Sequence, residues 1–317
     1  VNTNNGTMNK RIYPLAWYAI RKANLALASL DLMTSATQEE RDLIAGQAYF
    51  FRGFFHLELM QYYGGLPYID TLLVASQEMK VPRLSYRETA LKAAIDFRKA
   101  ADLLPINWDN TTAGKMTFGN NALRASKIEA LGYLGRNLLY AASPMMNESS
   151  TGVNAYDTEL CKQAAEVFAE AIKLCNETGA YKLEPWETRT NNFWVWSPGN
   201  RERPGGTEVI RNQSIYDVSY TRWCTNRTSN PVQFGAGNTR VEVPTHNYVE
   251  NYGMANGLPL DDPASGYDPE DPFSNREPRF YVDIVVDGNR IVNSTSAGAN
   301  QFAQFLNCGS NKGGAQG

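Results

Sequence analysis

The stretch from Phe50 to Asp70 reads FFRGFFHLELMQYYGGLPYID, and its aromatic half predicts the centre of a helical fold. On a helix the side chains of Phe51 and Phe55 share one face, and those of Phe50 and Phe54 share an adjoining face. Such a wide apolar surface suits a helix packed between two neighbours. Gly64-Gly65 can take left-handed dihedrals that end the helix, and Leu66-Pro67 leads the chain away. We therefore expect these aromatics to be core rather than ligand-binding.

Helix signals extend over the first 180 residues. Thr37-Gln38-Glu39-Glu40 and Ser85-Tyr86-Arg87-Glu88 both have the capping-box pattern. Prolines 67, 105 and 144 follow expected helix ends, where a missing amide does least harm. The pattern predicts helices over residues 9–32, 38–63, 86–104, 121–142 and 157–178.

A spacing recurs in two of these helices. The third has Ala93, Phe97 and Ala100 followed by Pro105, and the fifth has Ala164, Phe168 and Ala171 with Asn176 in the proline position. This spacing resembles the second helix of a tetratricopeptide repeat, in which small residues admit a neighbouring helix and the phenylalanine fills the space between. Leu131-Gly132 resembles part of the first helix of the repeat. The alternative is that two amphipathic helices share a spacing by chance.

Composition changes beyond about Tyr181. Gly, Pro, Asn, Asp and Thr become frequent, and long loops of this kind often carry binding sites. The sequence predicts a mainly α fold, with a helical tetratricopeptide-like scaffold over 1–180 and a loop-rich region over 181–317 packed on it as one structural domain. Short strands are expected at 193–196, 208–210, 240–243 and 281–286.

Charge and composition exclude several classes of function. The net charge is −3, which gives no electrostatic case for binding nucleic acid. The longest apolar run is broken by Arg52, His56 and Glu58, and falls short of the ~20 residues of a membrane span. With His56 and His246 as its two histidines, the chain is not expected to hold a metal, and no motif predicts a cofactor.

The four cysteines do not indicate a disulfide framework. Cys161 and Cys175 fall on one predicted helix and are separated by roughly 21 Å at about 1.5 Å per residue, too far for a bridge. Cys224 and Cys308 stay unassigned. The acidic run Asp261–Asp271 could hold calcium through oxygen ligands, but its spacing fits no known loop and a solvated turn is the better interpretation.

Six blocks along the chain are distinctive: Trp17–Asn24 (WYAIRKAN), Ala48–Ile69 (an arginine within aromatics that leads to YGGLPYI), Ala122–Pro144, Thr207–Ile210, Pro244–Leu260 and Asp271–Gly288. In this order they resemble the SusD/RagB-like outer-membrane nutrient-binding lipoproteins of Bacteroidetes, the D component of starch-utilisation systems. The departure at Glu277, where that family usually has Asp, is conservative.

The resemblance implies a function and a location. Members of this family bind oligosaccharides, or in some cases peptides, without catalysing a reaction, and act with a SusC-like TonB-dependent transporter. It implies a lipoprotein exposed on the bacterial outer membrane, attached to the membrane only through a lipid anchor that this chain lacks. The family pattern also implies more chain upstream and downstream, so the domain is expected to be incomplete at both ends.

Candidate ligand-binding residues lie in the loop-rich part. Flat aromatic faces bind the apolar faces of sugar rings, and amide, carboxylate and guanidinium groups bind the hydroxyls. The first choice is the cluster of Tyr216, Tyr220 and Trp223 with Arg222. The second is Trp194 and Trp196, which would share one side of a strand, although tryptophans in such a position are often core.

Two other functions stay open at this point. A tetratricopeptide-type module would bind a peptide or protein along a helical groove. An α-helical glycoside hydrolase would need two carboxylates at a set separation, and no pair in the sequence is singled out for that task.

Overall fold

The computed structural model describes residues 6–74, 76, 80–121, 124–183, 185, 210, 244–284, 286, 289–292 and 301–302. Two units divide the chain, Val1–Ser214 and Ile215–Gly317, and each is described by itself. The predicted boundary at residue 180 stays a prediction.

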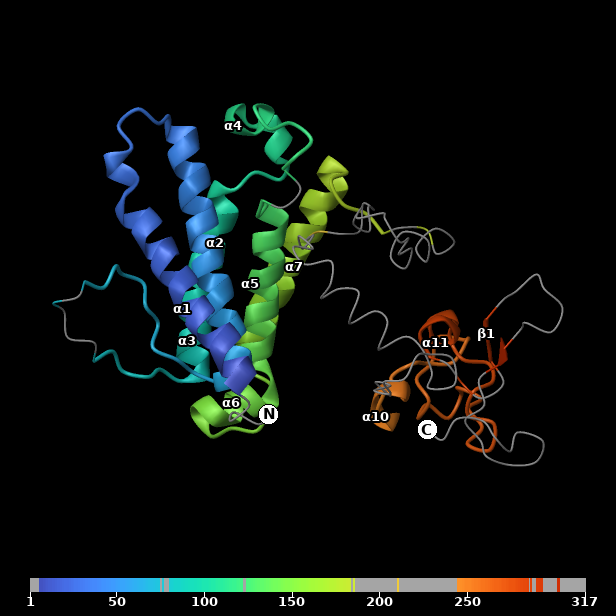
Figure 1. Cartoon of the computed structure of the whole chain (residues 1–317). Coiled ribbons are helices and arrows are strands. Elements are labelled where there is room, and N and C mark those ends of the chain that lie inside the picture. Colours follow the sequence, from blue (N-terminus) through green and yellow to red (C-terminus); the bar gives the residue numbers. More distant parts are fainter. Residues whose placement is uncertain are drawn as a thin grey trace. The chain divides into compact units, whose positions relative to one another are not determined.

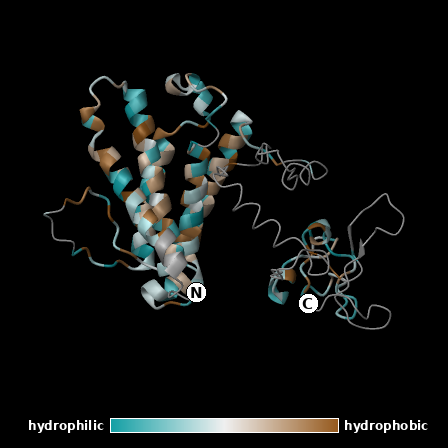
Figure 2. Cartoon of the chain, viewed as in Figure 1, coloured by the Kyte–Doolittle hydropathy of each residue, from teal (hydrophilic) through white to brown (hydrophobic). Residues whose placement is uncertain are grey.

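The first unit is a row of long helices that run alternately up and down (Figure 1). Each long helix packs mainly on the helices before and after it, in the order α1, α2, α3, α5, α7. Hydrophobic and hydrophilic residues alternate along these helices (Figure 2), as expected where one face meets a neighbour and another meets water. The elements are α1 (Gly6–Ala28), η1 (Leu30–Leu32), α2 (Gln38–Tyr63), α3 (Tyr86–Leu103), η2 (Trp108–Asn110), α4 (Thr112–Lys115), α5 (Lys127–Ala142), α6 (Pro144–Thr151) and α7 (Thr158–Thr178).

Helix starts and stops follow the predicted signals in most cases. Both capping boxes are present, with the hydroxyl of Thr37 accepting from the Glu40 amide and that of Ser85 from the Glu88 amide. α2 has the predicted bounds. α5 begins six residues later than predicted, because Ser126 caps it while the Asn121 side chain bonds to the η2–α4 segment.

The aromatic block of α2 lies in the core, as predicted. Phe50 is fully buried, while Phe51, Phe54 and Phe55 are partly buried and pack against the core. Phe50 contacts the ring of Phe97 on α3 with ring centroids 6.0 Å apart. These aromatics therefore hold the helices together rather than face a ligand.

The two predicted repeat phenylalanines pack in the same way. A Cβ added to Gly53 of α2 would meet the ring of Phe97 at 3.3 Å, and one added to Gly135 of α5 would meet the ring of Phe168 at 2.6 Å. Each phenylalanine thus fills the space above a glycine on the preceding long helix. The tetratricopeptide-like scaffold is confirmed, but Gly135 rather than Gly132 receives the aromatic ring, since Gly132 has no atom within 4 Å of its added Cβ.

The end of α2 corrects one detail. Gly64 has a φ of 74° and caps the helix, as predicted. Gly65 has no positive φ; it is required because an added Cβ would lie 2.1 Å from the carbonyl oxygen of Leu84. Gly64 is therefore required for its positive φ, and Gly65 is required because the backbone of Leu84 lies close to it.

The second unit contains α10 (His246–Val249), α11 (Pro278–Asp283) and an antiparallel pair, β1 (Arg290–Val292) and β2 (Gln301–Phe302), with an irregular register. The strand predicted over 281–286 is wrong in its first part. Residues 281–283 are helical, because Pro278 begins a short helix whose Phe280 is fully buried. The strands predicted at 193–196 and 240–243, and all but Ile210 of the one at 208–210, lie outside the described residues.

The two α5 glycines give a matched test of the repeat packing. Gly135→Ala should lower the free energy of unfolding by about 1–3 kcal/mol, since the new methyl group overpacks the Phe168 ring. Gly132→Ala should be neutral or stabilising by up to about 1 kcal/mol, because alanine favours a helix interior. Urea denaturation of both variants measures the difference. Equal stability of the two variants would contradict the assigned packing.

Candidate functional site

The connection between α2 and α3 is a long loop, in which residues 64–74, 76 and 80–85 are described. Figure 1 shows its described parts leaving the ends of α2 and α3. Long irregular loops in ordered proteins usually carry function. Its first end is fixed to the helices by buried polar groups and its returning end by Arg83, which makes it the candidate site among the described residues.

A buried ion pair lies beneath the loop. The Arg52 guanidinium on α2 donates from Nε and an Nη to the two carboxylate oxygens of Asp96 on α3, both at 2.6 Å. The two side chains are 7% and 3% exposed. Burial lowers the pKa of Arg52, but the hydrogen bond and charge of Asp96 outweigh this and raise it overall. A paired geometry of this kind offsets the cost of removing both charges from water.

The same guanidinium reaches the loop and the first helix. Its other Nη donates to the Asp70 carbonyl at 2.8 Å and to the side-chain oxygen of Asn24 on α1 at 2.9 Å. The Asn24 amide nitrogen donates in turn to the carbonyls of Ile69 at 2.9 Å and Thr71 at 3.0 Å. Backbone groups of residues 69–71, which have no strand partner, are satisfied by side chains of two helices.

Tyr68 and His56 complete this network. The Tyr68 hydroxyl donates to Asp96 at 2.6 Å, and its ring stacks on the His56 imidazole with centroids 3.9 Å apart. His56 Nδ1 lies 2.8 Å from the Arg52 carbonyl, and the Ile69 amide donates to Nε2 at 3.2 Å. Together these bonds assign the proton to Nδ1. Burial lowers the pKa of His56 to about 4, so the ring is neutral at pH 7.

The returning end of the loop is fixed separately. Arg83 donates from Nε to the Gly65 carbonyl at 2.7 Å and from Nη2 to the Tyr63 carbonyl at 2.6 Å. The Leu84 amide donates to the Leu66 carbonyl at 3.4 Å. Both ends of the loop therefore meet at the junction of α2 and α3.

These buried side chains are arranged to position the loop backbone rather than to catalyse a reaction. The buried charged and titratable groups bond to one another and to backbone, so their role is to hold residues 66–71 in one conformation. Asp70 and Thr71 expose their side chains above the network, and Lys92 lies 3.5 Å from the Asp70 carboxylate. These exposed groups are available for hydrogen bonds to a polar ligand.

Sequence reasoning missed the network, although a signal was present. Arg52 and His56 interrupt an otherwise apolar helix face, and a buried arginine requires an acidic partner. Asp96, which lies next to Phe97 in the repeat pattern, is that partner. Pairing the two residues required knowledge of how α2 and α3 are aligned.

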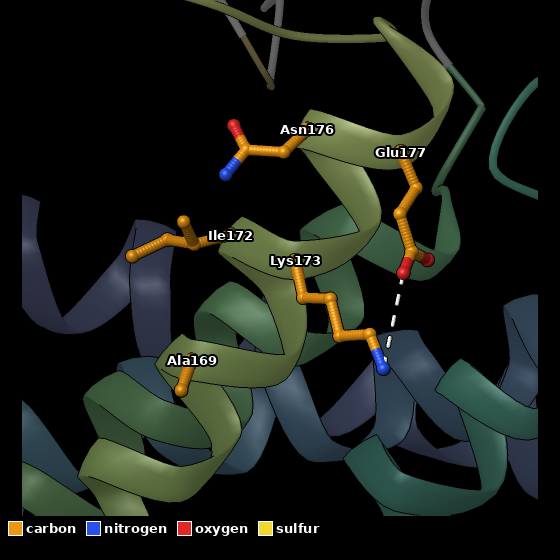
Figure 3. A pocket seen from close by; sticks show the side chains of 5 residues that line it. All are labelled: Ala169, Ile172, Lys173, Asn176 and Glu177. Carbon is orange, nitrogen blue, oxygen red and sulfur yellow. Dashed lines mark ion pairs between the residues drawn. The ribbon is translucent and has the colours of Figure 1, made fainter.

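A hollow on α7 is not a convincing second site. It has a volume of about 490 Å³ and is lined by Ala169, Ile172, Lys173, Asn176 and Glu177. Figure 3 shows that these side chains come from one helix, with Lys173 and Glu177 directed toward each other as an ion pair of 3.8 Å. Ligand sites normally have polar groups that converge from several elements.

The sequence-predicted ligand residues are not placed by the structure. Tyr216, Tyr220, Arg222, Trp223, Trp194 and Trp196 all lie outside the described residues, so this assignment stays a prediction. Cys224 and Cys308 also lie outside them, whereas Cys161 and Cys175 are both free on α7, as predicted.

The described part of the chain contains no group of three or more His, Cys, Asp or Glu side chains placed to hold a metal. None of its helices is both long and apolar enough to cross a membrane.

The fold and the loop define a class of protein: a tetratricopeptide-like helical scaffold that presents a long loop anchored by a buried polar network. Residues 1–136 match the SusD-like family, described as "Starch-binding associating with outer membrane". This part of the chain is therefore similar to the SusD-like family, as the sequence motifs predict. No curated protein matches the chain.

Solved structures show the same fold. A SusD-like protein from Bacteroides fragilis NCTC 9343 is 22% identical with a TM-score of 0.61, and the match covers 89% of this chain and 50% of that protein. A SusD-like carbohydrate binding protein from the same organism is 18% identical with a TM-score of 0.56, over 95% of this chain and 50% of that one. This chain thus spans about half the length of these relatives.

The buried ion pair can be tested against an exposed one. Asp96→Asn leaves Arg52 buried without its counter-charge and should lower the free energy of unfolding by about 3–5 kcal/mol. Glu170→Gln removes the partner of Arg98, in a pair whose side chains are 43% and 37% exposed, and should cost less than about 1 kcal/mol. Chemical denaturation measures both. Similar losses in the two variants would show that the network does not hold the fold.

The stability of the protein should depend on pH through His56. Its pKa is about 4 when folded, against an ordinary 6.5, so the unfolded chain binds more protons between these values. As pH falls from about 6.5 to 4, this histidine should cost the folded state about 3 kcal/mol. His56→Gln removes the titration, and the difference in unfolding free energy between wild type and variant should shrink over that window. A pH-independent difference would contradict a buried neutral His56.

Proposed function

We propose that this protein binds oligosaccharides at the bacterial cell surface without catalysing their cleavage. The observation that carries the proposal is the match of residues 1–136 to a family described as starch-binding and associated with the outer membrane. The shared fold of a solved SusD-like carbohydrate binding protein supports it. The exposed polar groups above the buried network suit a ligand rich in hydroxyl groups.

The proposed binding residues are Tyr216, Tyr220 and Trp223 with Arg222, and secondarily Trp194 and Trp196. An aromatic face that covers one sugar ring removes ~50–80 Å² of apolar surface from water, worth about 1–2 kcal/mol. Two or three such faces, less the cost of association, give roughly millimolar to micromolar affinity. That range suits a protein that captures a nutrient and releases it to a transporter.

The partner that we propose is a SusC-like TonB-dependent transporter of the outer membrane, to which the bound oligosaccharide is delivered. The protein is proposed to be a surface-exposed lipoprotein, attached to the membrane through a lipid anchor. The family description, which names the outer membrane, supports this location.

A second candidate is a peptide- or protein-binding module. The observation that favours it is the repeat packing itself, in which Phe97 and Phe168 each cover a glycine of the preceding long helix. Tetratricopeptide-like scaffolds bind partners along their helices. Binding of a peptide, without binding of any glycan, would establish this alternative.

Affinity electrophoresis against a panel of polysaccharides tests the proposal. Wild type should be retarded by at least one glycan, and Trp223→Ala should weaken that binding roughly five- to thirty-fold, the loss of about 1–2 kcal/mol. Tyr156→Ala changes a tyrosine of the first unit that is 63% exposed, and should bind as wild type does. Equal binding by Trp223→Ala would refute the site, and release of reducing ends from a polysaccharide would refute the non-enzymatic function.

A further inference from the structure

The second unit is organised around one buried arginine. Arg276 is 3% exposed and donates to the carbonyl oxygens of Pro272 at 2.7 Å, Val249 at 2.9 Å and Tyr252 at 2.7 Å. Its guanidinium lies over the buried Phe280 ring, 4.6 Å from the ring centroid. These contacts fix the turn at residues 272–276 against α10 and α11.

Two exposed aromatic rings flank Phe280. Phe273 is 44% exposed and stacks on it with centroids 6.1 Å apart, and Tyr281 is 51% exposed and meets it edge-on at 5.3 Å. The Tyr281 hydroxyl donates to the Phe273 carbonyl at 2.9 Å and accepts from the Arg276 amide at 3.1 Å. The hydroxyl is therefore bound into the turn, and the ring orientation is set while about half of the side chain faces water.

Polar side chains lie on the same turn. Ser274 and Asn275 are exposed between the two aromatic positions, and Asn275 has a φ of 54°. Glu277 comes four residues before Tyr281, and both its carboxylate oxygens lie 2.8 Å from the Arg279 guanidinium. A hydroxyl, an amide and a carboxylate–guanidinium pair can each bond to neighbouring hydroxyl groups of a ligand.

We propose that Phe273 and Tyr281, with the turn at residues 273–277, form a second sugar-binding surface that takes a pyranose ring of the oligosaccharide. Flat aromatic faces beside short polar side chains match the alternating apolar and hydroxyl surfaces of a sugar. Because Arg276 and the Tyr281 hydroxyl hold the turn before binding, little conformational entropy is lost on association. This inference rests on the proposed glycan binding and assigns part of it to described residues.

Three variants test this surface, with a bound polysaccharide from the electrophoresis panel as the probe. Phe273→Leu keeps an apolar side chain against Phe280 but removes the flat ring, and should weaken binding at least fivefold. Phe273→Tyr keeps the ring and should bind within about twofold of wild type, since the face rather than the edge makes the contact. Tyr18→Leu, at a 59% exposed tyrosine of the first unit, is the matched control and should bind as wild type does.

Asn275→Gly separates a binding effect from a folding effect. Glycine adopts a positive φ without strain, so the turn is kept while the amide is lost. Binding should weaken several-fold with an unchanged melting temperature. If Phe273→Leu and Asn275→Gly both bind as wild type does, this surface is not a sugar site and the proposed function still stands. If wild type binds no glycan of the panel, the proposed function fails and this inference fails with it.

Discussion

The ion pair between Arg52 and Asp96 is the contact on which the first unit depends. Its two charges are buried, so loss of either side chain would leave the other charge buried without its counter-charge. Arg52 also bonds to Asn24 on α1 and to the backbone of Asp70, so one side chain joins α1, α2, α3 and the loop after α2. Apolar packing alone would allow these helices to slide past one another. The directional bonds of this network select one alignment, and that alignment places residues 66–71.

Repeat packing and the buried network have different roles in this scaffold. Phe97 over Gly53 and Phe168 over Gly135 set how closely consecutive long helices approach, and these contacts recur along the row. The buried network around Arg52 and Asp96 lies among α1, α2 and α3, where the chain leaves α2 to form a loop. A few buried polar residues thus fix the conformation of one loop on an otherwise general helical scaffold. In the second unit Arg276 has a comparable role, since it holds a turn through three backbone carbonyls.

Most of the first unit can be predicted from local signals in the sequence, such as capping residues and helix-ending glycines. The rest depends on contacts between residues far apart in the sequence, which local patterns do not reveal. α2 was predicted to the residue because a capping box starts it and Gly64 ends it. The predicted start of α5 is six residues too early. Asn121 bonds to α4 instead, and the segment before Ser126 resembles a helix only in its composition. The network joins residues 44 positions apart, and no periodicity reports such a pairing. Residues 281–283, which the sequence assigns to a strand over 281–286, belong instead to the helix over 278–283, whose burial depends on Phe280.

We propose that the helices form a rigid scaffold and that the segments outside them bind the glycan. Hydrogen–deuterium exchange, measured with and without a bound oligosaccharide, tests this claim most directly. We predict that the ligand slows exchange in peptides that contain residues 191–227 and 273–281, and leaves the amides of α2, α3 and α5 unchanged. Slowed exchange confined to α2, α3 and α5, with no change in residues 191–227 or 273–281, would contradict the account and favour a groove between helices as the binding site.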